Sequence, residues 1–218
     1  MSTPANEIVW TIIVAAGSGL RFGSAKQFET LGDRRVVDWA IEEARHHSMG
    51  VVVVVPAGQE REPHEVAGGQ TRSESVRRGL AAVPDDATIV CVHDAARPFA
   101  SSVLYQRVIG AIVDGNDGAV PGVPVTDTIK QVNSSDVVIA TPQRATLRAV
   151  QTPQAFRAST LRRAHDHDGE GTDDAALVET VGGTVLVVPG DEMNRKITTR
   201  DDLDWARAHA HDLLFGEV

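Results

Sequence analysis

The chain has 218 residues, 42% of them hydrophobic, and a formal net charge of −9 at neutral pH. Its length and apolar content suit one substantial α/β domain, while its acidic balance argues against nucleic acid or an anionic membrane as the partner. A short polar start, no apolar stretch long enough to span a bilayer, and a lone cysteine favour a cytoplasmic protein without an internal disulfide.

Apolar runs alternate with helical spacing through the first half of the chain. Three short apolar runs predict buried strands, at residues 8–14, 51–55 and 88–92. Three segments with helical spacing predict helices, at residues 36–44, 71–83 and 103–112. This alternation predicts an α/β fold with a single Rossmann-like, mostly parallel sheet and helices on both faces.

The alternation stops after residue 119. Residues 123–132 and 137–141 flank a polar turn, which predicts a β-hairpin that protrudes from the main body. Beyond it the pattern predicts strands at 147–152 and 184–188, and helices near 160–165, from 172 onward and from 199 to 215. We expect one domain over residues 1–218, with the hairpin as an arm at about 123–145.

Residues 15–26 form a glycine-rich loop after the first predicted strand. Its small residues would let the backbone approach a ligand, and Arg21 and Lys26 could neutralise a triphosphate. A dinucleotide motif is excluded because Gly23 stands one position too late, and the ending of a P-loop is missing. The sequence favours a triphosphate-binding loop over an ordinary turn with exposed cations.

Two further segments follow predicted strands at the edge where parallel α/β sheets bind ligands. Asp94 could hold a metal ion or a ribose and Arg97 a phosphate, or Asp94 could cap a helix and pair with Arg97. Residues 68–75 place two glycines before a helix N-terminus, which could meet a nucleobase or could be a capped surface helix.

Three other polar positions have both a structural and a functional interpretation. Lys196, between the last strand and the last helix, could point into the same site or be solvated. We expect His93 to be a hydrogen-bonded structural histidine. We expect residues 165–168, His-Asp-His-Asp, to be solvated surface rather than a metal site.

Taken together and in this order, the motifs resemble the 2-C-methyl-D-erythritol 4-phosphate cytidylyltransferase family. The resemblance covers residues 12 to about 203. It rests on Ala-Ala-Gly-x-Gly-x-Arg with its following Lys-Gln, Val-His-Asp-Ala-Ala-Arg-Pro at 92–98, and shorter motifs at 127–130, 152–154, 172–173 and 196–198. The chain departs from the family where Ala25 replaces a frequent proline before Lys26, in a loop about two residues shorter.

The resemblance implies a nucleotidyltransferase-type fold and an enzyme that joins CTP to methylerythritol phosphate in non-mevalonate isoprenoid biosynthesis, with Mg²⁺ as cofactor. By matching position, it assigns catalysis to Arg21, Lys26, Arg144 and Lys196. It assigns CTP binding to Ala15, Ala16, Gly17, Gly19, Gly69, Ser75, Asp94 and Ala95, with Asp94 as the metal contact. It assigns the acceptor site to Arg97, Thr128, Arg144, Thr152 and Thr172.

The resemblance also implies a homodimer whose arms embrace, so that Thr128 and Arg144 serve the partner's site. Two alternatives remain. One is a cytidylyltransferase for another polyol phosphate, such as ribitol 5-phosphate, which would share the nucleotide half and differ only at the acceptor. The other is a nucleotide-binding protein without catalysis, and the joint presence of Arg21, Lys26, Asp94 and Lys196 argues against it.

Overall fold

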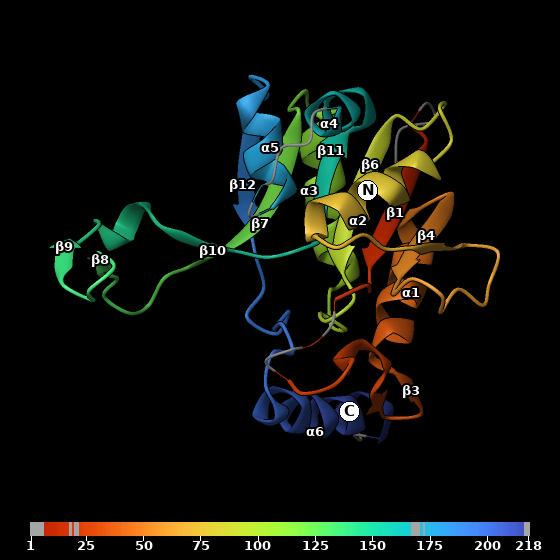
Figure 1. The fold of residues 1–218 in the computed structure, drawn as a ribbon, viewed down its shortest axis with the longest axis horizontal. Coiled ribbons are helices and arrows are strands. Elements are labelled where there is room, and N and C mark those ends of the chain that lie inside the picture. Colours follow the sequence, from red (N-terminus) through yellow and green to blue (C-terminus); the bar gives the residue numbers. More distant parts are fainter. Residues whose placement is uncertain (1–6, 18, 20–21, 167–170, 172, 216–218) are drawn as a thin grey trace.

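The computed structural model describes residues 7–17, 19, 22–166, 171 and 173–215. A mixed eight-stranded sheet forms its centre, in the order β10-β7-β11-β6-β1-β4-β5 with β12 beside β7 (Figure 1). Its strands are β1 (Val9–Val14), β4 (Gly50–Val55), β5 (Glu65–Ala67), β6 (Ile89–Asp94), β7 (Gly118–Pro124), β10 (Arg148–Val150), β11 (Gln154–Arg157) and β12 (Val185–Pro189). Central β1 runs parallel to both β4 and β6, which confirms the mostly parallel core.

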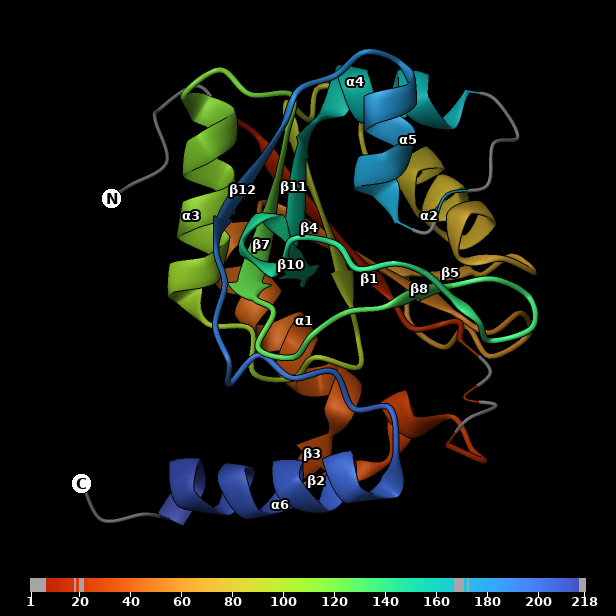
Figure 2. The same cartoon turned by 90° about the vertical axis from the view of Figure 1, so that its left-hand side faces the viewer.

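Helices cover both faces of the sheet (Figure 2). One face carries α1 (Val36–His47) and α3 (Ser102–Val113), and the other carries α2 (Arg72–Ala81), α4 (Ala158–His165) and α5 (Asp174–Thr180). Ile12 and Ile13 are adjacent in β1 and belong to the buried clusters on opposite faces. Side chains alternate across a strand, so this unbroken apolar run supplies both cores.

The last helix, α6 (Arg200–Phe215), lies below the sheet beside the short hairpin of β2 (Thr30–Leu31) and β3 (Arg34–Arg35) (Figure 1). A third apolar cluster joins them, with Leu31, Ile197 and Leu203 buried in it. Burial of Ile197 holds the segment before α6 against the main body. This matters for function because Lys196 belongs to that segment.

The arm leaves the main body as predicted, with β8 (Gln131–Val132) and β9 (Val138–Ala140) forming a two-stranded sheet of their own (Figures 1 and 2). Asp136 takes a φ of 57° in the connecting turn, a conformation that aspartate tolerates better than most residues. Within the expected extended segment over 123–132, only the two ends form strands, because β7 ends at Pro124 and β8 starts at Gln131.

Three strands of the main sheet are not predicted by the sequence pattern, namely the short β5 and the two described next, β7 and β11. β7 contains two prolines and two glycines, residues that strands usually avoid. β11 follows the cis peptide bond between Thr152 and Pro153 and runs antiparallel to β6 and β7. The expected strand over 147–152 shrinks to β10. None of the helices in the described part of the chain is long and apolar enough to cross a membrane.

Candidate active site

A cavity of about 590 Å³ lies beyond the carboxyl ends of β1 and β6. Its walls come from the loop after β1, the segment before α2, the end of β6 and the segment before α6. Ten of the residues selected from the sequence line it, namely Ala15, Ala16, Gly17, Gly19, Lys26, Gly69, Ser75, Asp94, Ala95 and Lys196. The fold therefore brings four distant segments to one place.

The loop after β1 is fixed from within by Gln27. Its buried amide Nε2 donates to the carbonyl oxygens of Ala15 (2.6 Å) and Gly17 (3.0 Å). Gln27 belongs to a 3₁₀ turn over Lys26–Phe28, so the same anchor holds Lys26 at the wall of the cavity. In the sequence, Gln27 stands out only as the residue after Lys26, and nothing there indicates this anchoring role.

Two glycines are required for the shape of the cavity walls. Gly19 has a φ of +65°, and a Cβ there would lie 1.8 Å from the backbone oxygen of Ser24. At Gly68 a Cβ would lie 2.2 Å from the Cβ of Ala16, so the two walls touch across this position. Any side chain would push the loops apart, which explains glycine at both places.

The segment before α2 forms the second wall. The Gly69 amide donates to Ser75 Oγ (3.0 Å), and that hydroxyl donates to the Thr71 carbonyl (2.9 Å). Thr71 caps α2 by accepting from the Glu74 amide, and the Glu74 carboxylate accepts from the Gln70 amide. The positive end of α2 therefore faces the cavity.

Asp94 is the acidic centre of the cavity. Its Oδ2 accepts a hydrogen bond from Lys196 Nζ at 2.6 Å, and its Oδ1 lies 3.5 Å from Arg72 Nε. Burial opposes its ionisation, but the charges of Lys196 and Arg72 outweigh burial and hold the pKa of Asp94 below its usual 3.8. The cavity therefore contains a carboxylate with two cationic partners.

Lys196 is held in place by the residues around it. The Ile197 amide donates to the Ala96 carbonyl (2.8 Å), and the side-chain amide of buried Asn194 donates to the Thr152 carbonyl (2.8 Å). The Arg97 guanidinium donates to the Asn194 carbonyl (2.6 Å), and the hydrogen bond of Arg97 to Asp94 joins only their backbones, amide to carbonyl, at 3.0 Å. The simple pairing of Asp94 with Arg97 is thus replaced by a pairing with Lys196.

His93 is a buried structural histidine, as predicted. Its Nε2 donates to the Arg97 carbonyl (3.1 Å), which leaves Nδ1 to accept from the Thr152 hydroxyl (2.9 Å). The same hydroxyl accepts from the Asp94 amide (3.0 Å), and burial lowers the pKa of His93 to about 4. Thr152 therefore supports the backbone of Asp94, and its contact with an acceptor stays a prediction.

Three other predicted acceptor residues, Arg97, Thr128 and Arg144, are absent from the described lining of the cavity. Thr128 and Arg144 are exposed on the arm, where Arg144 donates to the Thr126 carbonyl at 2.6 Å. Arg97 directs its guanidinium to the Asn194 carbonyl. Arg21 and Thr172 fall outside the described residues, so their predicted roles are untested.

Arg72 is a site residue that sequence reasoning missed. It lines the cavity and pairs with Asp174 (2.7 Å) as well as with Asp94. Asp174 in turn accepts from His165 Nε2 at 3.0 Å, and both are buried. The expectation that His165 is solvated surface is therefore wrong, because it shares the inward face of α4 with Leu161, one helical turn earlier.

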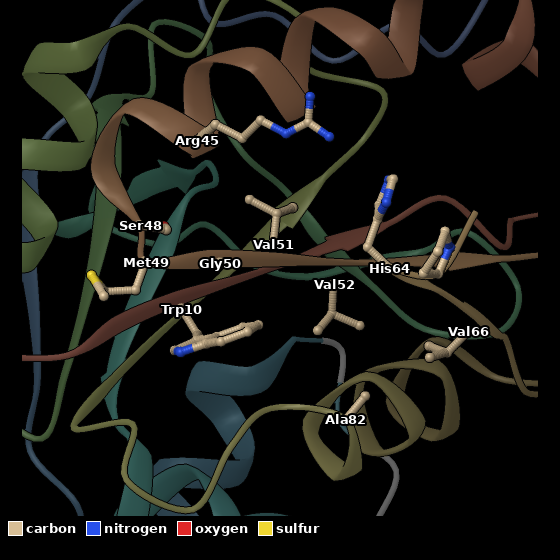
Figure 3. A pocket seen from close by; sticks show the side chains of 11 residues that line it. Trp10, Arg45, Ser48, Met49, Gly50, Val51, Val52, His64, Val66 and Ala82 are labelled. Carbon is tan, nitrogen blue, oxygen red and sulfur yellow. The ribbon is translucent and has the colours of Figure 1, made fainter.

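A second hollow of about 590 Å³ lies at the start of β4 (Figure 3). It is lined by Trp10, Met49, Gly50, His64 and other residues, with no carboxylate among its described lining. Val51 and Val52 point to opposite sides of the strand, so the lining wraps around a sheet edge. The cavity beyond the carboxyl ends of β1 and β6 is the better candidate site, because charged side chains from several segments line it.

The sequence profile of the 2-C-methyl-D-erythritol 4-phosphate cytidylyltransferase family, IspD, matches residues 9–211. The chain belongs to this family. A Nocardia farcinica protein of that name is 43% identical, with 89% of this chain and 90% of that protein aligned. The solved structure of the cytidylyltransferase from Thermus thermophilus is 35% identical, with a TM-score of 0.80 over 94% of this chain and 99% of that one.

Several relatives of this family member are longer proteins. The bifunctional enzyme IspD/IspF of Nitrobacter winogradskyi is 46% identical over 91% of this chain but only 55% of its own length. The chain therefore spans about half the length of the bifunctional curated relatives it matches.

Proposed function

We propose that this chain transfers the cytidylyl group of CTP to 2-C-methyl-D-erythritol 4-phosphate and releases pyrophosphate, a step in isoprenoid precursor biosynthesis. The observation that carries the proposal is the cavity at the sheet edge. There a glycine-rich loop with Lys26 meets Asp94 and Lys196 in a chain of this family. Relatives that carry the cytidylyltransferase name support the same reaction.

The reaction is a displacement at the α-phosphorus of CTP. A phosphate oxygen of the acceptor forms a bond to that phosphorus, and the bond to the β-phosphate breaks with its electron pair leaving on pyrophosphate. A phosphate is already anionic at neutral pH, so no general base is required. Negative charge grows on the α-phosphoryl oxygens, and fixed cations stabilise it. We assign this role to Arg21 and Lys26, and the placing of the attacking phosphate to Lys196.

We further propose that Asp94 holds Mg²⁺ together with the phosphates of CTP. The described residues include no cluster of three or more potential metal ligands. Mg²⁺ commonly takes only one or two carboxylates and completes its shell with phosphate oxygens and water, which fits a single ionised Asp94. The ion would offset the charge of the triphosphate.

We also propose that two chains form a homodimer through their arms, with Thr128 and Arg144 completing the partner's acceptor site. Three apolar side chains of the arm are strongly exposed, namely Val137 (58%), Val138 (52%) and Ile139 (58%). Such exposed apolar side chains on a protruding hairpin favour a protein partner. The cytoplasmic location stays a prediction.

Pyrophosphate release tests the proposed function. The chain is supplied with CTP and Mg²⁺, and methylerythritol phosphate and ribitol 5-phosphate are offered in parallel. We expect release mainly with methylerythritol phosphate. Preference for ribitol 5-phosphate would keep the nucleotide half of the proposal and overturn the acceptor half, while no release with either would favour a nucleotide-binding protein without catalysis.

A further inference from the structure

A line of charged groups runs from the cavity into the protein. Asp94 at the cavity lies 3.5 Å from Arg72 Nε, and Arg72 Nη1 donates to Asp174 at 2.7 Å. Asp174 is fully buried and also accepts from His165 at 3.0 Å. His165 Nδ1 is buried without a hydrogen-bond partner among the described residues, so the line ends there.

The contacts of Arg72 distinguish it from a phosphate-binding arginine. Two of its three guanidinium nitrogens face carboxylates, one on each side, although the side chain lies at the cavity wall. A guanidinium is planar and rigid, so fixing one edge fixes the direction of the other. Asp174 therefore determines how Arg72 faces Asp94.

Asp174 itself cannot touch a ligand in the cavity. Its side chain has no exposed surface, and it starts α5 on the far side of Arg72. A buried carboxylate is costly unless it is paired, and Arg72 and His165 provide that pairing. His165 alone could provide the pairing that a buried Asp174 needs for stability. The additional ion pair of Asp174 with Arg72, at the cavity, therefore requires another explanation.

We propose that Arg72 is a positioning residue that, anchored by Asp174, sets the direction of the Asp94 carboxylate for the reaction. This inference rests on the proposed function. Lys196 contacts one oxygen of Asp94, and Arg72 faces the other. With both oxygens held, the carboxylate keeps one orientation toward the triphosphate. Supporting residues of this kind typically contribute about 10–100-fold to activity.

Asp174→Asn is the decisive variant because it changes a residue that cannot contact substrate. We expect kcat to fall about 10–100-fold while the Kd of CTP, measured by calorimetry, changes less than about threefold. Arg72→Gln should lower kcat to a similar extent, and Arg72→Lys should recover part of the lost kcat. The double variant Asp174→Asn with Arg72→Gln should have a kcat no lower than that of Arg72→Gln alone. All variants are assayed at a temperature well below the midpoint of their thermal unfolding.

Asp117→Asn is the matched control. Asp117 accepts from the Thr184 amide (3.0 Å) and the Thr160 hydroxyl (3.2 Å), at the opposite end of the sheet. Its loss should lower stability and leave kcat unchanged. An equal fall in kcat for this control, or an unchanged kcat in Asp174→Asn, would overturn the inference. Parallel losses of kcat and CTP affinity in the Arg72 variants would overturn it too and make Arg72 a nucleotide-binding residue instead.

A crystal structure of Asp174→Asn decides the inference without turnover. We expect the Asp94 carboxylate to lose its contact with Arg72 and to turn toward Lys196. If Asp94 keeps its present position, the inference fails whether or not the wild-type chain is active. If the wild-type chain releases no pyrophosphate but Asp94 turns, the proposed function fails and the positioning role of Arg72 stands.

Discussion

At the scale of single residues, the cavity depends on side chains that hold others in place. Gln27 fixes the loop that carries Lys26, and Thr152 fixes the backbone of Asp94. These supports could not be predicted from the sequence, because hydrogen bonds between residues 10 to 58 positions apart have no local pattern. The residues they support could be predicted, because each stands in a recognisable motif at a strand end.

Lys26→Ala tests the charge-stabilising role of that lysine. If Lys26 acts mainly on the transition state, kcat should fall about 10²–10³-fold while the Kd of CTP changes little. Steady-state kinetics and calorimetry separate the two. The exposed Arg163→Ala on α4 is a control for the loss of a surface cation. Equal losses in kcat and CTP affinity would assign Lys26 to ground-state binding.

Asp174 gives stability a defined pH dependence. Burial opposes its ionisation, but the hydrogen bond from His165 and the charge of Arg72 outweigh burial and lower its pKa from 3.8. The unfolded chain therefore takes up the proton first as pH falls, so the stabilisation by ionised Asp174 is complete above about pH 4 and lost below it.

Asp174→Asn should accordingly be less stable than the wild type by about 3–5 kcal/mol at neutral pH, the usual cost of breaking a buried pair. Urea unfolding at a series of pH values measures the difference. We expect the difference to shrink below about pH 4. A difference that stays constant down to strongly acidic pH would show that Asp174 is not ionised in the folded chain.

At the scale of elements, the spacing of apolar residues predicts the helices and strands with regular patterns and misses those without them. The valine-rich β4 and the capped α2 agree with the prediction within a few residues, because apolar runs and capping residues are local signals. β7 was missed because its stability comes from neighbours on both sides, which override the low strand propensity of Pro121 and Gly122. The burial of His165 was not predicted, because the polar sequence His-Asp-His-Asp at 165–168 gives no sign that its first residue lies on the inward face of α4.

The loop after β1 gives a prediction at this scale. Gly19→Ala should be destabilised by about 1–2 kcal/mol, because its φ is positive and its Cβ would collide with the Ser24 backbone. The KM for CTP should rise as the loop shifts. Gly17→Ala is the control for stability, since a Cβ there meets nothing within 4 Å among the described atoms. Equal unfolding midpoints for the two variants would contradict this account of the loop.

At the scale of the whole molecule, the proposed homodimer would explain the arm. The arm protrudes from the main sheet (Figure 1) and carries exposed apolar side chains, which a partner chain would cover. Ile139→Asp should therefore shift the chain from dimer to monomer in analytical ultracentrifugation, because it places a charge in the proposed interface. A wild-type chain that is monomeric and fully active would contradict the dimer proposal.

Arg144→Ala connects the arm to the reaction. If Arg144 reaches the partner's acceptor site, the variant should raise the KM for methylerythritol phosphate about tenfold or more and leave CTP binding unchanged. Arg148→Ala, an exposed arginine nearby that bonds to carbonyl groups of the arm, is the control. A parallel loss of CTP affinity in Arg144→Ala would show that the acceptor assignment is wrong.

The central claim is that the acceptor's own phosphate attacks the α-phosphorus of CTP in this cavity. Oxygen-18 in the phosphate of methylerythritol phosphate follows that step directly. Phosphorus-31 NMR of the product should show the isotope shift of oxygen-18 bonded to the phosphorus that comes from CTP, and mass spectrometry should find no label in pyrophosphate. A CTP-derived phosphorus without oxygen-18, labelled pyrophosphate, or a product formed without pyrophosphate would contradict the account.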